Sequence, residues 1–302
     1  MKYIDIHSHL GFEDYGADRA EVIKRMQEAQ VGTITVGADL PSSIEAVKVA
    51  TQNENVWACI GQHPTHNMTE TEMNHGSFGF NEADYEELIK NPKVVAVGEC
   101  GLEYYKLTGD ACPVVNNSDC STAGVEKIIA KQKEDFIKQI NFALKHNKAL
   151  MLHIRDVDKK YQKGKLVTSE PDNKLNSAFE DTLEILNKIK QERGLTSFRG
   201  DVHFFTGKLD VAQKFVELGF TISFIGLITY IEDFNKTIKA LPLEAIQAET
   251  DSPYVAPVPH RGTRNEPSYV IPVYQKIAEI KGLDPETVRL QLLENAKRVF
   301  GV

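Results

Sequence analysis

The 302-residue sequence contains no uninterrupted apolar run that approaches the ~20 residues of a membrane-spanning helix. Its N-terminus also lacks the basic region followed by an apolar stretch that marks a secretory signal. We therefore expect neither a membrane span nor a signal peptide, and a cytoplasmic location by default. The hydrophobic fraction of 41% and the charged fraction of 26% are typical of a globular protein.

Positively charged residues are fewer than negatively charged ones. Lys and Arg together number 35 against 43 Asp and Glu, so the formal net charge is -8. A protein that binds duplex DNA tightly and without sequence preference is normally basic, because neutralising phosphates dominates its affinity. The composition therefore argues against tight nucleic-acid binding, although a nuclease that binds weakly and turns over stays compatible with it.

Cysteine is scarce, and none of the four cysteines forms a CxxC pair. Cys59 and Cys100 lie in apolar, strand-like contexts, where buried reduced thiols are expected. Cys112 and Cys120 share a polar loop and could form a disulfide, although the reducing cytosol disfavours one.

Short β-rich runs alternate with longer amphipathic stretches along the chain. The expected strands lie near 3–8, 32–37, 55–60, 93–98, 148–153, 200–204, 219–224 and 245–249. The expected helices lie near 18–29, 41–52, 82–90, 125–146, 176–192, 208–218, 232–240, 268–281 and 285–299. Eight strands alternating with helices predict a single-domain (β/α)8 TIM barrel over residues 1–302. An open, doubly wound sheet is the structural alternative.

Two stretches with little periodicity interrupt this alternation, near 106–124 and 157–175. Each follows an expected strand that ends in a candidate ligand. In a barrel, such positions are loops over the mouth of the active site, where function is tuned.

Side chains that bind metals recur where the expected strands end. They are His7, His9, Glu99, His153, His203 and Asp251. Four imidazoles and two carboxylates are enough to ligate a hydrolytic centre with two metal ions. Because alternate side chains of a strand share one face, His7 and His9 can point the same way.

Each of these residues also has a simpler interpretation. An isolated histidine is more often a core or surface imidazole, and Asp251 could cap a turn. Asp5, on the same strand face as His7, either orients a ligand histidine or is a polar residue of the barrel interior. His63 follows the third strand and could contact substrate. The other histidines are expected to be solvated or structural: His66, His75, His146 and His260.

Seven short motifs, in order, resemble the TatD-type metal-dependent deoxyribonucleases, within the wider metallo-amidohydrolase barrels. The motifs are Ile4-Asp5-Ile6-His7-Ser8-His9, Gly61-Gln62-His63-Pro64, Val97-Gly98-Glu99-Cys100-Gly101-Leu102, His153-Ile154-Arg155, His203-Phe204-Phe205-Thr206-Gly207, Glu249-Thr250-Asp251-Ser252-Pro253-Tyr254 and Arg261-Gly262-Thr263-Arg264-Asn265-Glu266-Pro267. The similarity runs from about residue 3 to the C-terminus, and the ordered set is far more specific than any single motif.

The resemblance implies two divalent metal ions, with Mg²⁺, Mn²⁺ and Zn²⁺ as the open choices. One ion would be held by His7, His9 and Asp251, and the other by His153 and His203. Glu99 would bridge them. Family members hydrolyse phosphodiester bonds in DNA, often from the 3′ end.

Two positions depart from the family pattern. Glu103 stands where the family usually has Asp, which puts any supporting role of this carboxylate in doubt. Phe204 replaces the cysteine that usually follows the sixth-strand histidine, a change that we expect to be harmless.

We therefore expect a phosphodiesterase that binds the ends of single-stranded DNA weakly and cleaves them. Asp251 and Glu99 are the expected catalytic residues, with Asp251 as the proton acceptor from the attacking water. Arg155 and His63 are expected to position phosphate, and the fork of an Arg side chain suits this task. Nothing in the sequence indicates a membrane or an obligate protein partner.

Two other functions stay open. The first is hydrolysis of a small-molecule ester, lactone or amide on the same barrel, which the acidic charge and the two insertions favour slightly. The second is a barrel that binds a metal or a partner protein without catalysis, although all six expected ligand positions are intact.

Overall fold

The computed structural model describes residues 1–67, 79–107, 122–156 and 177–302. Most of the two expected insertions, and with them Cys112 and Cys120, lie outside the described residues, as does His75. Cys59 and Cys100 are buried free thiols, as expected. Among the described residues, no helix is both long and apolar enough to cross a lipid bilayer.

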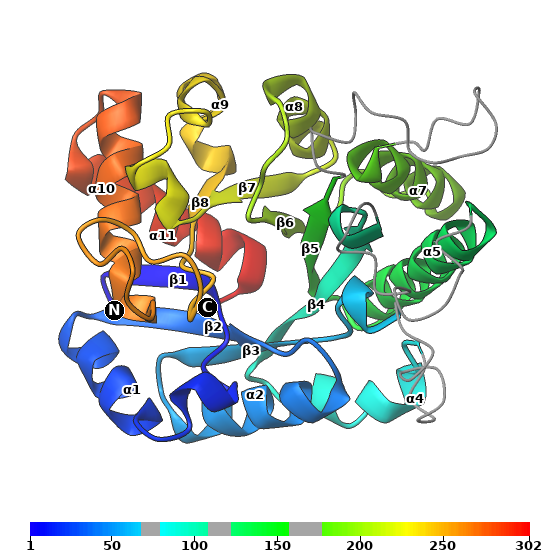
Figure 1. The fold of residues 1–302 in the computed structure, drawn as a ribbon, viewed down its shortest axis with the longest axis horizontal. Helices are drawn as coiled ribbons and strands as arrows, with labels where there is room; N and C mark the ends of the chain where they lie inside the picture. Colours follow the sequence, from blue (N-terminus) through cyan, green and yellow to red (C-terminus); the bar gives the residue numbers. More distant parts are fainter. Residues whose placement is uncertain (68–78, 108–121, 157–176) are drawn as a thin grey trace.

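Eight strands, each hydrogen-bonded to the next, form one parallel sheet in the order in which they occur along the chain. They are β1 (Tyr3–Ser8), β2 (Val31–Val36), β3 (Val56–Ile60), β4 (Val94–Glu103), β5 (Ala149–Arg155), β6 (Gly200–His203), β7 (Phe220–Phe224) and β8 (Ile246–Ala248). A parallel bridge between Ser8 and Ser252 joins the two ends of the sheet. The predicted TIM barrel is thereby confirmed, and the open sheet is excluded (Figure 1).

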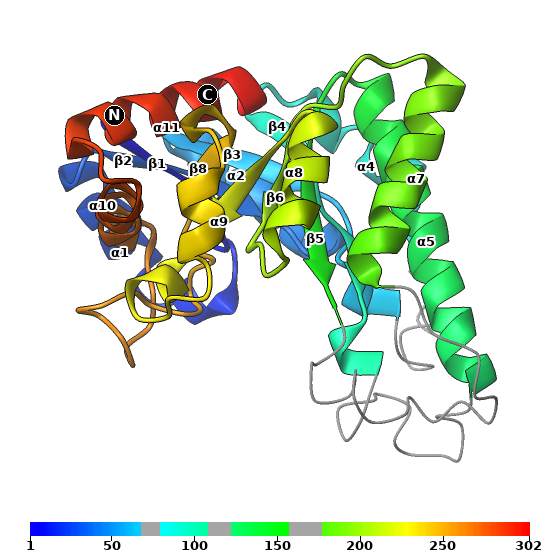
Figure 2. The same cartoon turned by 90° about the horizontal axis from the view of Figure 1, so that it is seen from above.

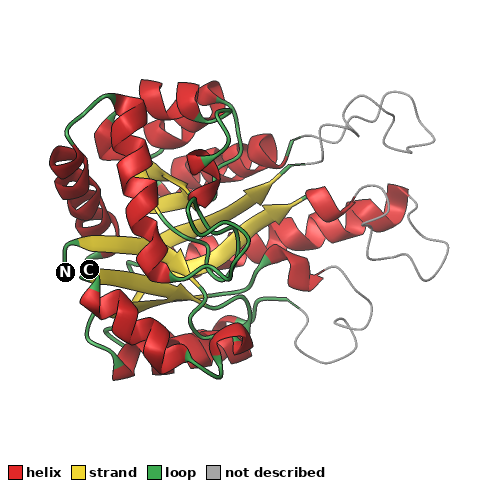
Figure 3. Cartoon of the chain, turned by 60° about the vertical axis from the view of Figure 1, so that its left-hand side comes forward, coloured by secondary structure: helices red, strands yellow, loops and turns green. Residues whose placement is uncertain are grey.

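The helices that separate consecutive strands in sequence lie outside the ring of strands, and two further helices follow β8 (Figures 1 and 3). They are α1 (Arg19–Glu28), α2 (Leu40–Gln52), α4 (Glu82–Tyr85), α5 (Thr122–Lys145), α7 (Ala178–Arg193), α8 (Leu209–Glu217), α9 (Asn235–Ala240), α10 (Val270–Lys281) and α11 (Pro285–Phe300). Most bounds agree with the expected ones to within three residues.

The start of α11 follows its local sequence. The Asp284 carboxylate accepts a hydrogen bond from the Thr287 backbone N–H at 2.9 Å, and Pro285 occupies the first turn. This N-cap satisfies a donor that the helix itself leaves unpaired. Gly282, with a φ of 63°, ends α10 in the left-handed conformation that glycine adopts without strain.

The single helix expected near 82–90 is instead α4 followed by a 3-10 turn at Leu88–Lys90. Glu86 and Glu87, which lie between these two elements, have right-handed helical dihedrals. The segment therefore continues in a helical conformation, as expected, but its last turn is a 3-10 turn. The segment ends at Asn91, which is extended because Pro92 follows it.

Helix α11 closes the end of the barrel from which the strands start (Figure 2). Its apolar side chains pack with those that β1 to β5 point into the barrel. This inner cluster contains Ile4, Ile6, Ile34, Val36, Cys59, Val95, Ala96, Ala149, Met151, Leu293, Ala296, Val299 and Phe300. Both chain termini lie at this same end of the barrel (Figure 3).

Leu292 and Leu290 give a matched test of the contribution of α11 to stability. Leu292 is fully buried, whereas Leu290 on the same helix is 52% exposed. We expect Leu292→Ala to reduce the free energy of unfolding by about 2–5 kcal/mol, because it removes buried methyl groups and leaves a cavity. Leu290→Ala should change the same quantity by less than about 0.5 kcal/mol. Urea unfolding followed by circular dichroism measures both, and equal losses would contradict this packing.

Candidate metal centre

The barrel closes between β1 and the segment that follows β8, and this seam carries three of the expected ligands. The Asp251 backbone N–H donates to the His7 carbonyl at 2.9 Å, and the His9 N–H donates to the Ser252 carbonyl at 2.8 Å. The Nε2 atoms of His7 and His9 lie 3.3 Å apart. Asp251 Oδ1 is 3.8 Å from the first and 3.5 Å from the second. All three side chains are almost fully removed from solvent.

Glu99, from β4, lies at the centre of the remaining histidines. Its Oε1 is 2.8 Å from His153 Nδ1, 3.1 Å from His203 Nε2 and 3.5 Å from His63 Nε2. Its other oxygen is 3.6 Å from His7 Nε2. One buried carboxylate therefore contacts histidines from four different strands or strand ends.

Two glycines on either side of Glu99 let β4 approach β5 closely. A Cβ atom on Gly98 would lie 2.4 Å from the Met151 carbonyl oxygen, and one on Gly101 would lie 2.0 Å from that of His153. Their φ angles of 153° and 146° also disfavour other residues. Glycine at both positions allows Glu99 to reach the His153 ring.

Hydrogen bonds to the second ring nitrogen orient three of the histidines. His9 Nδ1 lies 2.9 Å from the Val36 carbonyl, His203 Nδ1 lies 2.9 Å from Glu249, and His63 Nδ1 lies 2.6 Å from the Thr65 hydroxyl. For His9 and His203, a carbonyl or carboxylate partner at Nδ1 fixes a proton there, so that Nε2 carries the lone pair of the neutral ring. His63 differs, because its Nδ1 accepts the Thr65 backbone N–H at 3.1 Å and its proton therefore lies on Nε2. These Nε2 atoms all point into the cluster.

The sequence analysis missed Glu249 as a functional residue. Its Oε2 binds His203 Nδ1, and its Oε1 accepts the Phe204 N–H at 2.6 Å and the Ser223 hydroxyl at 2.7 Å. The signal was present, because Glu249 precedes Asp251 by two residues in a strand-like stretch that ends in carboxylates.

Glu103 and Asp5 also support the ligands. Glu103 Oε2 is 3.1 Å from His153 Nε2, so the longer carboxylate still reaches the histidine. Asp5 does not contact an imidazole. Its Oδ1 accepts the backbone N–H of Thr250 at 2.8 Å and of His7 at 3.2 Å, and it thereby ties the backbones of the two closing segments together.

Electrostatics keep Glu99 ionised. Burial alone would raise the pKa of its carboxyl, but the imidazoles of His63, His203 and His7 outweigh burial and hold that pKa well below its usual range. Burial, together with the neighbouring His153, lowers the pKa of His63 well below its ordinary value. Glu99 is therefore in the ionised form in which carboxylates bind metals. The charges of Glu249 and Glu99 outweigh burial and raise the pKa of His203 well above its ordinary value, so binding of a metal by His203 would release a proton.

The donor atoms fit divalent metal ions. At the strand ends, three groups of three side chains each place one ligand atom within 4.8 Å of the other two: His7 with His9 and Asp251, His7 with Glu99 and His203, and His63 with Glu99 and His153. A fourth such group, Glu82 with Glu86 and His146, lies at α4 and the end of α5. Mixed imidazole and carboxylate donors suit Zn²⁺, Mn²⁺ and similar ions. The six expected ligands thus lie together. His63 belongs to the same cluster, because its Nε2 lies 3.5 Å from Glu99 Oε1.

Comparison with known proteins agrees with this geometry. Residues 4–301 match the model of one protein family, described as TatD related DNase. This chain belongs to that family. A metal-dependent hydrolase of Bacillus subtilis, YabD, is 33% identical over 99% of this chain and 98% of its own length. YcfH of Escherichia coli, also named a metal-dependent hydrolase, is 29% identical over 100% of this chain and 97% of its own.

Solved structures show the same TatD-type barrel. The TatD homologue YjjV of Escherichia coli superposes with a TM-score of 0.76, at 23% identity, over 100% of this chain and 98% of its own. An amidohydrolase of Saccharomyces cerevisiae gives a TM-score of 0.72 at 18% identity, over 99% of this chain and 100% of its own.

Arg155 lies at the rim of the TatD-type site and not among its donor atoms. It ends β5 two residues after His153, is exposed, and its guanidinium carbon lies 4.0 Å from the centre of the Tyr105 ring. Stacking on an aromatic ring leaves the edge of the guanidinium free to donate hydrogen bonds. His66, His146 and His260 take no part in the three donor groups around Glu99 and Asp251.

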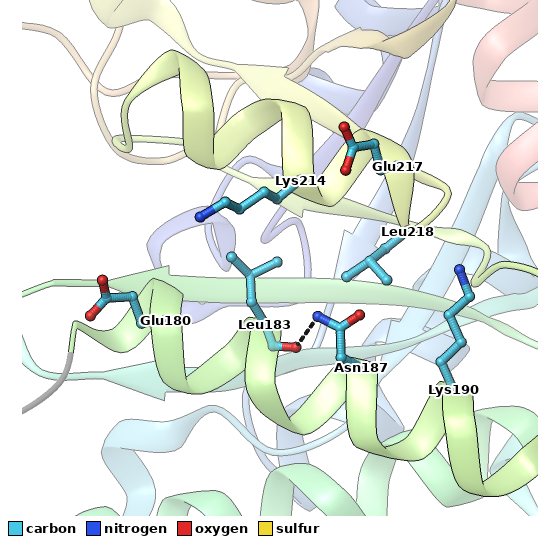
Figure 4. Close-up of a pocket in the computed structure, with 7 residues that line it drawn as sticks. All are labelled: Glu180, Leu183, Asn187, Lys190, Lys214, Glu217 and Leu218. Atoms are coloured by element: carbon cyan, nitrogen blue, oxygen red, sulfur yellow. Dashed lines mark hydrogen bonds between the residues drawn. The ribbon is translucent and has the colours of Figure 1, made fainter.

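A groove on the outside of the barrel is separate from this centre (Figure 4). Helices α7 and α8 form its walls, with Leu183 and Leu218 between charged side chains such as Lys190 and Glu217. None of the residues that line this groove is one of the candidate ligands at the strand ends.

A second buried carboxyl near His203 is that of Asp201, two residues earlier on β6. Its oxygens lie 2.6 Å from the Thr221 hydroxyl and 2.5 Å from that of Ser223, which also contacts Glu249. Ser223 has one proton and cannot donate to both carboxyls. Burial, and next the charge of Glu249, raise the pKa of Asp201 to about 8, which agrees with a proton on Asp201.

We expect Asp201→Asn to change how stability depends on pH. Between about pH 4 and 8 the folded protein keeps a proton on Asp201 that the unfolded chain has lost, so wild-type stability falls as pH rises, by up to ~1.4 kcal/mol per pH unit. Asn has the shape of the protonated acid and does not titrate. In urea unfolding with a chelator present, the stability of the variant relative to wild type should therefore increase from pH 5 to 8. A difference that stays constant across this range would contradict the assignment.

Proposed function

We propose that this protein is a metal-dependent hydrolase that cleaves phosphodiester bonds of DNA, acting from the 3′ end of weakly bound single strands in the cytoplasm. The observation that carries the proposal is the sharing of one buried carboxylate, Glu99, between two groups of histidines, beside the His7, His9 and Asp251 triad. Membership of the TatD-related DNase family supports the choice of substrate.

Two divalent ions fit the proposal, with Mg²⁺, Mn²⁺ and Zn²⁺ as candidates. His7, His9 and Asp251 would hold one, His153 and His203 the other, and Glu99 would contact both. Ions held there would lower the pKa of bound water and offset negative charge on the phosphate.

The chain's own residues would handle the proton and the substrate. Asp251 is 8% exposed and 3.5 Å from His9 Nε2, so it reaches both the donor cluster and entering water. We assign it as acceptor of the proton from the attacking water. Arg155 follows His153 by two residues on β5, and the His63 ring lies 4.2 Å from the His153 ring, centroid to centroid. We assign the positioning of the phosphate to these two side chains.

The alternative substrate is a small-molecule ester, lactone or amide. The net charge of -8 favours it, because electrostatic attraction to polyanionic DNA is weak. A direct assay separates the two. Purified protein is incubated with single-stranded DNA and with a panel of aryl esters and lactones, each with Mg²⁺, Mn²⁺ or Zn²⁺. Stepwise shortening of DNA supports the proposal, and turnover of esters alone would replace it.

Asp251→Asn and Glu99→Gln should each lower kcat/KM on single-stranded DNA by at least ~10²–10⁴-fold, because each removes a charge that the reaction needs while keeping the side-chain shape. Thermal unfolding should show that both variants still fold. His146→Ala is the matched control, since this half-buried histidine lies beyond the end of α5, away from the cluster. Wild-type activity in either carboxylate variant would contradict the assigned roles.

Metal content gives an independent test. After removal of bound metal with a chelator, activity should disappear and return on addition of Mn²⁺ or Zn²⁺. Elemental analysis of the reloaded wild type should give two ions per chain. The double variant His7→Ala with His9→Ala should retain about one, because the His153 and His203 side of the cluster is unchanged. A wild type that binds a single ion would exclude the two-metal arrangement.

A further inference from the structure

Tyr254 is a solvent-exposed aromatic side chain next to the candidate metal centre. The residue is 48% exposed, although Asp251, three residues earlier, is buried. Single exposed aromatic residues are common on protein surfaces and need no explanation. The position of Tyr254 does call for an explanation, because its ring centroid lies 6.2 Å from that of the candidate ligand His9.

The backbone of Tyr254 is held rigidly. Its N–H donates to the Asp251 carbonyl at 2.9 Å, and its carbonyl accepts from Asn265 Nδ2 at 2.6 Å. Asn265 is fully buried and its Nδ2 also donates to the Thr250 carbonyl at 2.9 Å. The same buried amide therefore ties the backbone of Tyr254 to the segment that carries Asp251.

The surroundings of the ring favour a flat ligand. Phe12 stacks on His9 with centroids 4.3 Å apart, so aromatic rings line this side of the site. The exposed ring of Tyr254 adds a further aromatic face beside the candidate centre. The part of a nucleotide that suits such a face is the base, because a base stacks on aromatic side chains.

We propose that Tyr254 stacks on the nucleobase next to the scissile phosphate and thereby selects a nucleic-acid substrate. This inference rests on the proposed nuclease function and names the part of the substrate that this side of the site recognises. Stacking of a base on an aromatic side chain tolerates every base, because each base has a π-face. The contact would give affinity for DNA without requiring a basic surface, in agreement with the net charge of -8.

The test compares two 5′-fluorescein-labelled octamers of thymidine. One is intact, and in the other the two 3′-terminal residues are abasic. Binding is measured by fluorescence anisotropy in Ca²⁺, and cleavage in Mn²⁺, for wild type and for Tyr254→Ala, Tyr254→Phe and Leu290→Ala. Leu290 has a similar exposure at the opposite end of the barrel. Thermal unfolding verifies that each variant folds.

We expect Tyr254→Ala to weaken binding of the intact octamer by roughly 5- to 150-fold, the range of a lost base stack. Tyr254→Phe and Leu290→Ala should behave as wild type. On the abasic octamer, wild type and Tyr254→Ala should be equal. An equal loss on both octamers, or no loss on the intact one, would overturn the role of Tyr254. Failure of the wild type itself to bind and cleave either octamer would instead overturn the nuclease function, and this inference with it.

Discussion

The two hydrogen bonds that close the barrel are the constraint on which the candidate site depends. Asp251 N–H to the His7 carbonyl and His9 N–H to the Ser252 carbonyl join residues more than 240 positions apart in the chain. Since the same residues carry the donor side chains, the closure of the sheet and the assembly of the triad are one event. Asp5 strengthens this seam from below by accepting the N–H groups of both closing segments.

The second half of the site depends on the electrostatic balance around Glu99. A lone buried carboxylate would be costly, and so would a group of buried imidazoles with no acceptor. Placed together, Glu99 and the imidazoles pair with one another, and Glu249 and Glu103 extend this pairing to the outer nitrogens of His203 and His153. The cluster is therefore a buried polar network, in which His7 Nδ1 has no hydrogen-bond partner among the described residues. This arrangement explains why so many titratable groups can be buried at one end of a barrel whose other end is filled with apolar side chains.

Much of this was predictable from the sequence, and the reason is geometric. Strand ends of a parallel barrel converge, so a histidine or acid that ends an apolar run must face its counterparts from other strands. That rule identified His7, His9, Glu99, His153, His203 and Asp251, which the structure brings together. Their roles as ligands and catalysts stay predictions, as do those of Arg155 and His63.

The supporting residues were harder to foresee, because their partners are fixed by packing across neighbouring strands. Glu249 contacts His203 and Ser223 from β6 and β7, and no spacing along the chain reveals that register. The reach of Glu103 to His153 depends on β4 continuing to Glu103, five residues beyond the expected end of that strand. The hydrophobic pattern predicted an end at 98, because Glu99 and Glu103 are polar. Both are nevertheless buried, and both pair with His153.

Local strain is concentrated next to the donor side chains. Asp251 and Phe204 have positive φ angles of 52° and 46°, which cost energy in residues other than glycine. Phe204 directly follows His203, and the Glu249 carboxylate holds its N–H at 2.6 Å. At Phe204 and Asp251 the chain leaves the extended conformation of the strands. A loose scaffold would relax such turns, so the packed barrel and α11 at its far end must hold them.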